Sequence, residues 1–222
     1  MHELPFLDFH AHGAQPPTFG VLRVVSIGPF DAAPEGEPYT VGLHPWCTAE
    51  PWADAAIAAL PSALERRGAV GLGEVGLDRL CGATMQQQRA WLAQQLRLAD
   101  GLGLPVVLHC VRAWAELLAE LRLFPSLRWA VHGFRGSLAV ARGLLEAGGR
   151  ISLGAALLRD AGLAELAAAV PVERLFLETD DAEGQPLQEL YRRVAELRGL
   201  AVEELRQIMM RNGNSFFGDM FL

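Results

Sequence analysis

The chain has 222 residues, of which 51% are hydrophobic and 20% charged, a balance that describes a globular protein with a sizeable core in one large or two small α/β domains. Its net charge of −7 excludes a global basic field for nucleic acid, so a polyanionic substrate would have to be held locally by metal ions and a few arginines. All nineteen basic residues are arginine, which excludes Schiff-base lysine chemistry, a P-loop lysine and a carboxylated lysine as a bridge between metals.

The cysteines indicate a reducing compartment. Cys47, Cys81 and Cys110 are odd in number, widely spaced and form no C-x-x-C motif, so no disulfide framework is expected. The chain opens with no signal-peptide pattern and contains no apolar run of about 18 residues. The expected location is therefore the cytoplasm, with no membrane association.

Short apolar runs alternate with longer helical patterns along the whole sequence. Strands are predicted at residues 4–12, 21–28, 39–44, 69–73, 105–109, 128–132, 150–153 and 174–178. Helices are predicted at residues 51–67, 84–102, 113–123, 137–146, 160–170, 186–198 and 202–217. The links before the second and third strands are rich in proline and glycine and too short for a full helix.

This alternation indicates a parallel sheet, and eight strands predict an α/β fold of the (β/α)8 TIM-barrel class. The chain is shorter than the roughly 250 residues typical of such barrels. The shortfall lies in the first forty residues, where the early outer helices are expected to be shortened or missing. Since no linker, low-complexity tract or repeat divides the sequence, residues 1–222 are predicted to form a single barrel domain.

Polar residues with metal-ligand chemistry gather where the predicted strands end. His10 and His12 are two apart on a strand, so their side chains are expected to project from the same face. In a TIM barrel the carboxyl ends of the strands form the active site. Six such residues are expected to converge there as metal ligands: His10, His12, Glu74, His109, His132 and Asp180. A mixed imidazole and carboxylate set of this size suits a two-metal centre, in which Glu74 is the natural bridge because no lysine exists.

Five motifs in a fixed order carry a resemblance to a known family. They are D-x-H-x-H at residues 8–12, G-E-x-G-L-D at 73–78, P-V-x-x-H at 105–109, H-x-F at 132–134 and E-T-D at 178–180. Residues 42–45 (G-x-H-P) and 212–217 add to the match. In these motifs the chain resembles the TatD-type metal-dependent deoxyribonucleases, a branch of the amidohydrolase-like barrels.

The resemblance implies that the same six residues bind two divalent ions, with zinc, manganese or magnesium as candidates. It also implies that Asp180 is the base that activates the attacking water, so that Asp180 and Glu74 are the expected catalytic residues. The implied activity is hydrolysis of phosphodiester bonds in DNA, as a 3′-exonuclease or a related phosphodiesterase. The expected partners are DNA ends or a small phosphodiester, and the expected state is a monomer or a homodimer.

Departures from the family pattern fall in loops expected to contact substrate. Trp46 follows Pro45 where the family often has a second histidine, and Arg79 follows G-L-D where an aromatic residue or histidine is usual. The basic residue that normally stands close behind the fifth-strand histidine is displaced to Arg112. Metal chemistry is therefore better supported than DNA as the substrate.

Several residues leave alternatives open. Asp8 either orients a ligand or closes the barrel by hydrogen bonding, and Asp78 and Glu178 are expected to support neighbouring groups rather than bind metal. A thiol nucleophile at Cys110 is disfavoured, because strand alternation turns its side chain away from the His109 side chain. Contacts with substrate phosphates are expected from His44, Arg79, Arg112 and Arg135.

The sequence is also compatible with two other functions. One is a hydrolase with the same metals acting on a small amide, ester or lactone. The other is a non-catalytic metal-binding interaction module, which an intact six-ligand set disfavours.

Overall fold

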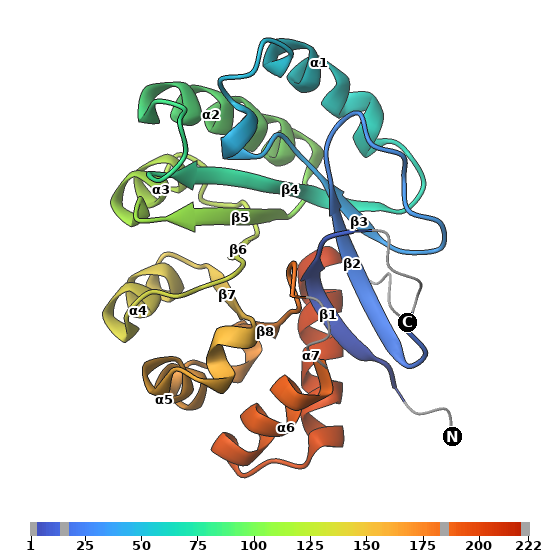
Figure 1. Cartoon of the computed structure of the whole chain (residues 1–222), viewed down its shortest axis with the longest axis vertical. Helices are drawn as coiled ribbons and strands as arrows, with labels where there is room; N and C mark the ends of the chain where they lie inside the picture. The colour runs from blue at the N-terminus through green and yellow to red at the C-terminus, as the bar shows by residue number, and fades with distance from the viewer. Residues whose placement is uncertain (1–3, 14–17, 183–186, 219–222) are drawn as a thin grey trace. The chain divides into compact units, whose positions relative to one another are not determined.

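The computed structural model describes residues 4–13, 18–182 and 187–218. Eight strands form one sheet in which they follow sequence order, and the strand pairs of known register are parallel (Figure 1). The strands are β1 (Phe6–Ala11), β2 (Val21–Ile27), β3 (Tyr39–Val41), β4 (Ala69–Asp78), β5 (Val106–Val111), β6 (Trp129–Val131), β7 (Arg150–Leu153) and β8 (Leu175–Leu177). The predicted (β/α)8 fold class is confirmed.

The helices follow the strands as predicted, and their ends lie within three residues of the predicted ones. They are α1 (Ala53–Leu64), α2 (Met85–Leu102), α3 (Trp114–Leu121), α4 (Leu138–Glu146), α5 (Ala161–Ala169), α6 (Leu187–Arg198) and α7 (Val202–Phe217). Short 3-10 helices are η1 (Pro45–Cys47), η2 (Ala155–Leu158) and η3 (Val172–Arg174). The described residues between β1 and β3 contain no helix, as expected for the shortened early region. Among the described residues, no helix combines the length and the apolar character needed to cross a membrane.

Backbone contacts divide the chain into two compact units. The first unit comprises residues up to Val24 and from His132 onward, and the second comprises residues Val25–Val131. β2 contributes to both, whereas β1, β7, β8 and α4–α7 belong to the first and β3–β6 and α1–α3 to the second. The prediction of a single domain over residues 1–222 stays a prediction.

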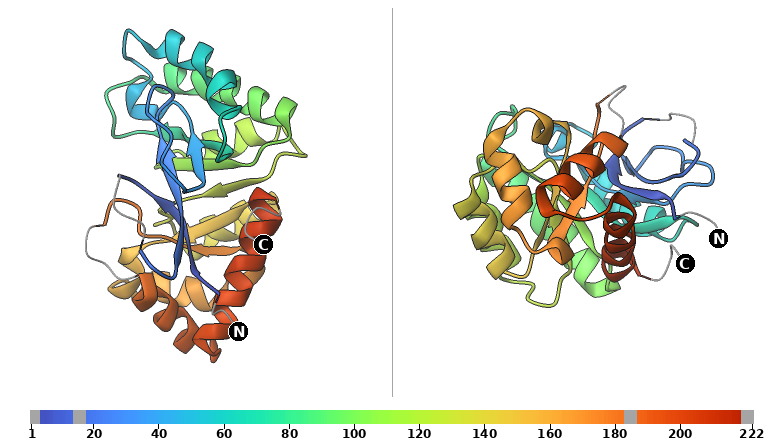
Figure 2. Two further views of the ribbon diagram at one scale, coloured as in Figure 1. Left: turned by 90° about the vertical axis from the view of Figure 1, so that its right-hand side faces the viewer. Right: turned by 90° about the horizontal axis from the view of Figure 1, so that it is seen from below.

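The core of the first unit is aromatic. The ring of Phe9 on β1 stacks on Phe176 of β8 at 4.0 Å between centroids, and Phe216 and Phe217 of α7 lie 5.5 Å from Phe9. In Figure 2, α6 and α7 lie side by side, consistent with their backbone contacts. The hydroxyl of Tyr191 on α6 donates to the Leu7 carbonyl at 2.8 Å. The two C-terminal helices therefore fix the strand that carries His10.

In the second unit, β4 is five residues longer than predicted. Gly73 and Gly76 suggest a strand end by sequence, yet the strand continues through Glu74 to Asp78. The reason is close packing against β5, because a Cβ atom at Gly76 would lie 1.9 Å from the His109 carbonyl oxygen. Gly76 also has a φ angle of 154°, which side chains rarely permit. Glycine here allows the two strands to approach, and Glu74 lies inside the strand.

Candidate metal centre

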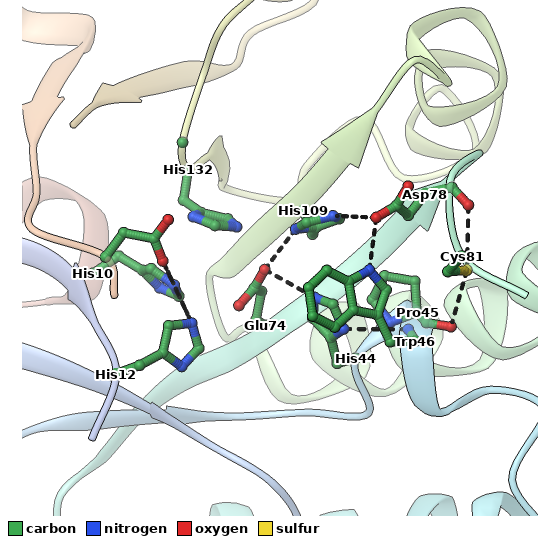
Figure 3. A network of polar contacts seen from close by, with 12 residues as sticks. His10, His12, His44, Pro45, Trp46, Glu74, Asp78, Cys81, His109 and His132 are labelled. Carbon is green, nitrogen blue, oxygen red and sulfur yellow. Dashed lines mark hydrogen bonds and ion pairs between the residues drawn. The ribbon is translucent and has the colours of Figure 1, made fainter. Parts of the chain in front are cut away.

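The first unit brings together His10, His12 and Asp180. The Nε2 atoms of the two histidines are 3.2 Å apart (Figure 3). They lie 3.8 Å and 3.6 Å from Asp180 Oδ1. The His10 side chain is only 1% exposed, whereas the side chains of His12 and Asp180 are 40% and 33% exposed. One side of this group is therefore buried and the other is open to solvent.

Asp180 is positioned by its main chain. Its N–H donates to the carbonyl of His10 and its carbonyl accepts from the N–H of His12, both at 3.0 Å. These two bonds form a parallel bridge to Ala11, which joins the segment after β8 to β1. The φ angle of Asp180 is 56°, a left-handed conformation that aspartate and asparagine tolerate better than most residues. The carboxylate is thereby aimed beside the two histidines.

His132, which follows β6, belongs to the same unit. Its ring lies 4.1 Å from the ring of His10, and its Nδ1 is 3.7 Å from Glu178 Oε1. Glu178 is fully buried and also accepts from the N–H of Gly133. Burial alone raises the pKa of Glu178, but the neighbouring imidazole of His132, with a further contribution from His10, holds that pKa below its usual value. An ionised Glu178 is suited to orienting His132, as expected for a supporting carboxylate.

Asp8 joins β1 to the segment after β8. Its Oδ1 accepts from the N–H of Thr179 at 2.9 Å and its Oδ2 accepts from the Thr179 hydroxyl at 2.6 Å. Burial raises the pKa of Asp8 to about 7, although both hydrogen bonds work against that rise. These contacts support the barrel-closing alternative for Asp8.

The second unit brings together His44, Glu74 and His109. Glu74 Oε1 lies 2.7 Å from Nδ1 of His109 and 3.1 Å from Nε2 of His44. Glu74 is 5% exposed. Its buried carboxylate and the two imidazoles form a second group of oxygen and nitrogen donors. His44 is more than the phosphate contact that the sequence suggested, because it touches a predicted metal ligand directly.

Asp78 and Trp46 extend this second group. Asp78 Oδ2 accepts from the indole N–H of Trp46 at 2.6 Å and lies 3.1 Å from Nε2 of His109 (Figure 3). Its Oδ1 accepts from the N–H of Leu80 at 2.7 Å. Burial alone raises the pKa of Asp78, yet the hydrogen bonds from Trp46, Leu80 and His109 together lower it below its usual value. The sequence suggested only that Asp78 fixes the following loop, and its contact with His109 is new.

Two buried glutamines of α2 hold the main chain beneath this group. The Gln88 side chain accepts from the Asp78 N–H at 2.6 Å and donates to the Asp78 carbonyl at 2.8 Å. The Gln95 side chain accepts from the Leu43 N–H at 2.8 Å and donates to the Leu43 carbonyl at 3.2 Å, next to His44. Sequence reasoning missed both residues. Their spacing of seven, which places two polar side chains on the apolar face of one helix, was the available signal.

The predicted substrate contacts differ in their surroundings. The Arg79 guanidinium pairs with Glu116, and its Nε donates to the Arg112 carbonyl at 2.8 Å. An existing partner for this charge argues against a phosphate clamp at Arg79. Arg112 and Arg135 are exposed, and their phosphate contacts stay predictions.

Burial raises the pKa of the Cys110 thiol to about 12, which makes a thiolate nucleophile there unfavourable.

Comparison with known proteins identifies the family. Residues 32–218 match the sequence profile described as TatD related DNase. The chain belongs to this family.

Two relatives are similar to this chain over about four fifths of its length. A protein of Escherichia coli K12 named "Uncharacterized metal-dependent hydrolase YjjV" is 32% identical over 195 residues, which cover 80% of this chain and 75% of that protein. A protein of Erwinia amylovora named "3'-5' ssDNA/RNA exonuclease TatD" is 33% identical over 201 residues, which cover 81% and 77%. The crystal structure of Escherichia coli YjjV superimposes with a TM-score of 0.81 at 28% identity, covering 96% of this chain and 97% of that one. The chain therefore has the TatD-type barrel fold and is a metal-dependent hydrolase of this family.

The donor chemistry of both groups fits a divalent metal ion. His10, His12 and Asp180 offer ligand atoms within 4.8 Å of one another, and so do His44, Glu74 and His109. We call these the first cluster and the second cluster, and we include His132 in the first. Imidazole and carboxylate donors at this spacing are those that zinc and similar cations take in proteins. The roles of the individual residues as ligands, and of Glu74 as a bridge, stay predictions.

Proposed function

We propose that this TatD-family hydrolase removes nucleotides from the 3′ end of single-stranded DNA. The observation that carries the proposal is the first cluster, in which the Asp180 carboxylate stands half-open to solvent beside two histidine Nε2 atoms. That arrangement suits activation of a water molecule. The named exonuclease of Erwinia amylovora, 33% identical to this chain, supports the substrate class.

We propose that each cluster holds one divalent ion. The ligands would be His10, His12, His132 and Asp180 in the first cluster, and Glu74 and His109, assisted by His44, in the second. Zinc or manganese suits these imidazole-rich sets better than magnesium does. When bound, such ions lower the pKa of water and neutralise charge on a phosphodiester.

The chain's own residues supply proton transfer and orientation. The Asp180 carboxylate, which is partly exposed, accepts the proton of the attacking water. Glu178 and Asp78 fix the rings of His132 and His109, so that one nitrogen of each ring is directed toward a supporting carboxylate. His44, Arg112 and Arg135 are the candidates for contact with substrate phosphates.

The test is hydrolysis of single-stranded DNA by protein stripped with a chelator and refilled with magnesium, manganese or zinc. The Asp180→Asn protein, prepared in parallel, controls for contaminating nuclease. We expect stepwise metal-dependent loss of 3′ nucleotides, absent from the variant. Equal cleavage by the two proteins would mean that the activity comes from a contaminant or does not need Asp180, and either result would contradict the proposal.

A second candidate is hydrolysis of a small amide, ester or lactone at the same clusters. It is favoured by the net charge of −7 and by the engagement of Arg79 with Glu116, which leaves less positive charge for a polyanion. Assays on DNA and on such small substrates with the same refilled protein would separate the two. Metal binding without turnover of either class would support an interaction module instead. A cytoplasmic location and a monomeric or homodimeric state stay predictions.

A further inference from the structure

The indole of Trp46 is the least expected feature of the second cluster. The side chain is 63% exposed, although large aromatic side chains are usually mostly buried in folded proteins. Since it lies beside the cluster rather than in the core, its exposure calls for an explanation other than packing.

The orientation of this indole is fixed. Its N–H donates to Asp78 Oδ2 at 2.6 Å, and its main-chain N–H donates to Nδ1 of His44 at 3.2 Å. The backbone is held by η1, which begins at Pro45 and is closed by the Thr48 hydroxyl donating to the Pro45 carbonyl at 2.8 Å. An exposed ring that is already immobilised loses little conformational entropy when a ligand packs on it.

The neighbours of the ring leave a surface for stacking. The imidazoles of His44 and His109 lie 4.9 Å and 6.2 Å away and meet the indole at 89° and 77°, so neither is stacked parallel on it. Leu80, whose N–H is bound to Asp78, is 66% exposed and adds apolar surface near the same carboxylate. A flat apolar ligand could therefore rest on the indole while its polar groups reach the cluster.

We propose that Trp46 is a stacking platform for a nucleobase near the 3′ end of the substrate. This inference rests on the proposed nuclease function, and it names the residue that orients the strand at the second cluster. Stacking on an aromatic side chain is tolerant of base identity, because every base has a π face. A residue of this kind supplies affinity without basic charge, which suits a protein with a net charge of −7.

The experiment measures binding in a background that does not cleave. The Asp180→Asn protein, refilled with manganese, is titrated into two fluorescein-labelled single-stranded oligonucleotides, and anisotropy reports affinity. They are identical except that one carries abasic residues at its last two 3′ positions. We expect the base-bearing strand to bind roughly 5- to 100-fold more tightly, the contribution of one stacked base.

Three further variants in that background identify the platform. Trp46→Ala should bind both strands with similar affinity, because the platform is gone. Trp46→Phe should keep most of the preference, since it retains a ring while losing the N–H that binds Asp78. Trp52→Ala is the matched control: this indole is 40% exposed and its ring neighbour is Phe30, so its removal should leave the preference unchanged.

Two results would overturn the inference: equal or absent binding of the two strands by the parent protein, or an unchanged preference in Trp46→Ala. Cleavage by the protein that retains Asp180 is scored separately. Failure to cleave either strand would therefore count against the proposed nuclease function, while a base preference that depends on Trp46 would still support the platform.

Discussion

In the first unit, Asp180 is fixed by two main-chain hydrogen bonds to β1, whereas in the second unit His109 and Glu74 are fixed by side-chain contacts that extend through Asp78 to Trp46. A main-chain bridge holds its residue whatever the side chain is. A chain of side-chain contacts transmits a change at one end to the other. Substitutions should thus remove chemistry cleanly from the first cluster and disturb geometry in the second.

The largest effect on activity is expected from substitutions of Asp180, which also test how its main chain is held. Both Asp180→Asn and Asp180→Ala should lower kcat by roughly 100- to 10,000-fold, because the proton acceptor is lost. Only the alanine variant should also lose about 1 kcal/mol of stability, since alanine is disfavoured at a φ of 56°. Activity assays and urea unfolding measure the two effects. Equal stability of the two variants would show that the bridge does not constrain this backbone.

The next effect concerns the buried carboxylate that joins β1 to β8. The pKa of Asp8 is raised to about 7 by burial, from an ordinary value of 3.8. Between these values the folded chain holds a proton that the unfolded chain has released, so stability should fall as pH rises through this window, by up to about 1.4 kcal/mol per pH unit. Asp8→Asn, which mimics the protonated acid, should abolish this slope. Urea unfolding of chelated protein near pH 4 and near pH 7 measures it, and a slope shared by both proteins would contradict the assignment to Asp8.

The Gln88 side chain supports the second cluster through the main chain of Asp78. Gln88→Ala removes the side chain that bonds both main-chain groups of Asp78, which should cost about 2 kcal/mol. Displacement of Asp78 should also disturb His109 and lower kcat/KM by roughly 10- to 100-fold. Gln86→Ala, at an exposed position of the same helix, is the matched control and should behave as wild type in unfolding and kinetic assays.

The smallest effects are expected at the exposed arginines. Arg79→Ala should change stability by no more than about 0.5 kcal/mol, because the pair with Glu116 is solvent-exposed. It should also leave the salt dependence of DNA binding unchanged. Arg112→Ala should reduce the slope of log K against log salt by about one, the value for one lost phosphate contact. A reduced slope for Arg79→Ala instead would return Arg79 to the substrate contacts.

Sequence patterns determined the strand order, the (β/α)8 class and most candidate ligands, because each depends on short-range spacing. The two-residue step in D-x-H-x-H predicts that His10 and His12 share a face, and their Nε2 atoms are 3.2 Å apart. The alternation of strands and helices likewise needs no distant contact. The placement of Glu74 inside β4 could not be predicted, since Gly73 and Gly76 read as strand ends until β5 lies against them.

What only the tertiary structure decided are pairings between residues far apart in the chain. Thr179 binds Asp8 from 171 positions away, and Gln95 binds the main chain of Leu43 from 52 positions away. The residues next to Trp46 in sequence do not determine where its indole lies. Asp78, 32 positions later, supplies the acceptor that fixes the indole. The sequence specifies which groups can bind a metal ion, but the hydrogen-bond partners that hold them in place depend on which strands and helices meet in the folded chain.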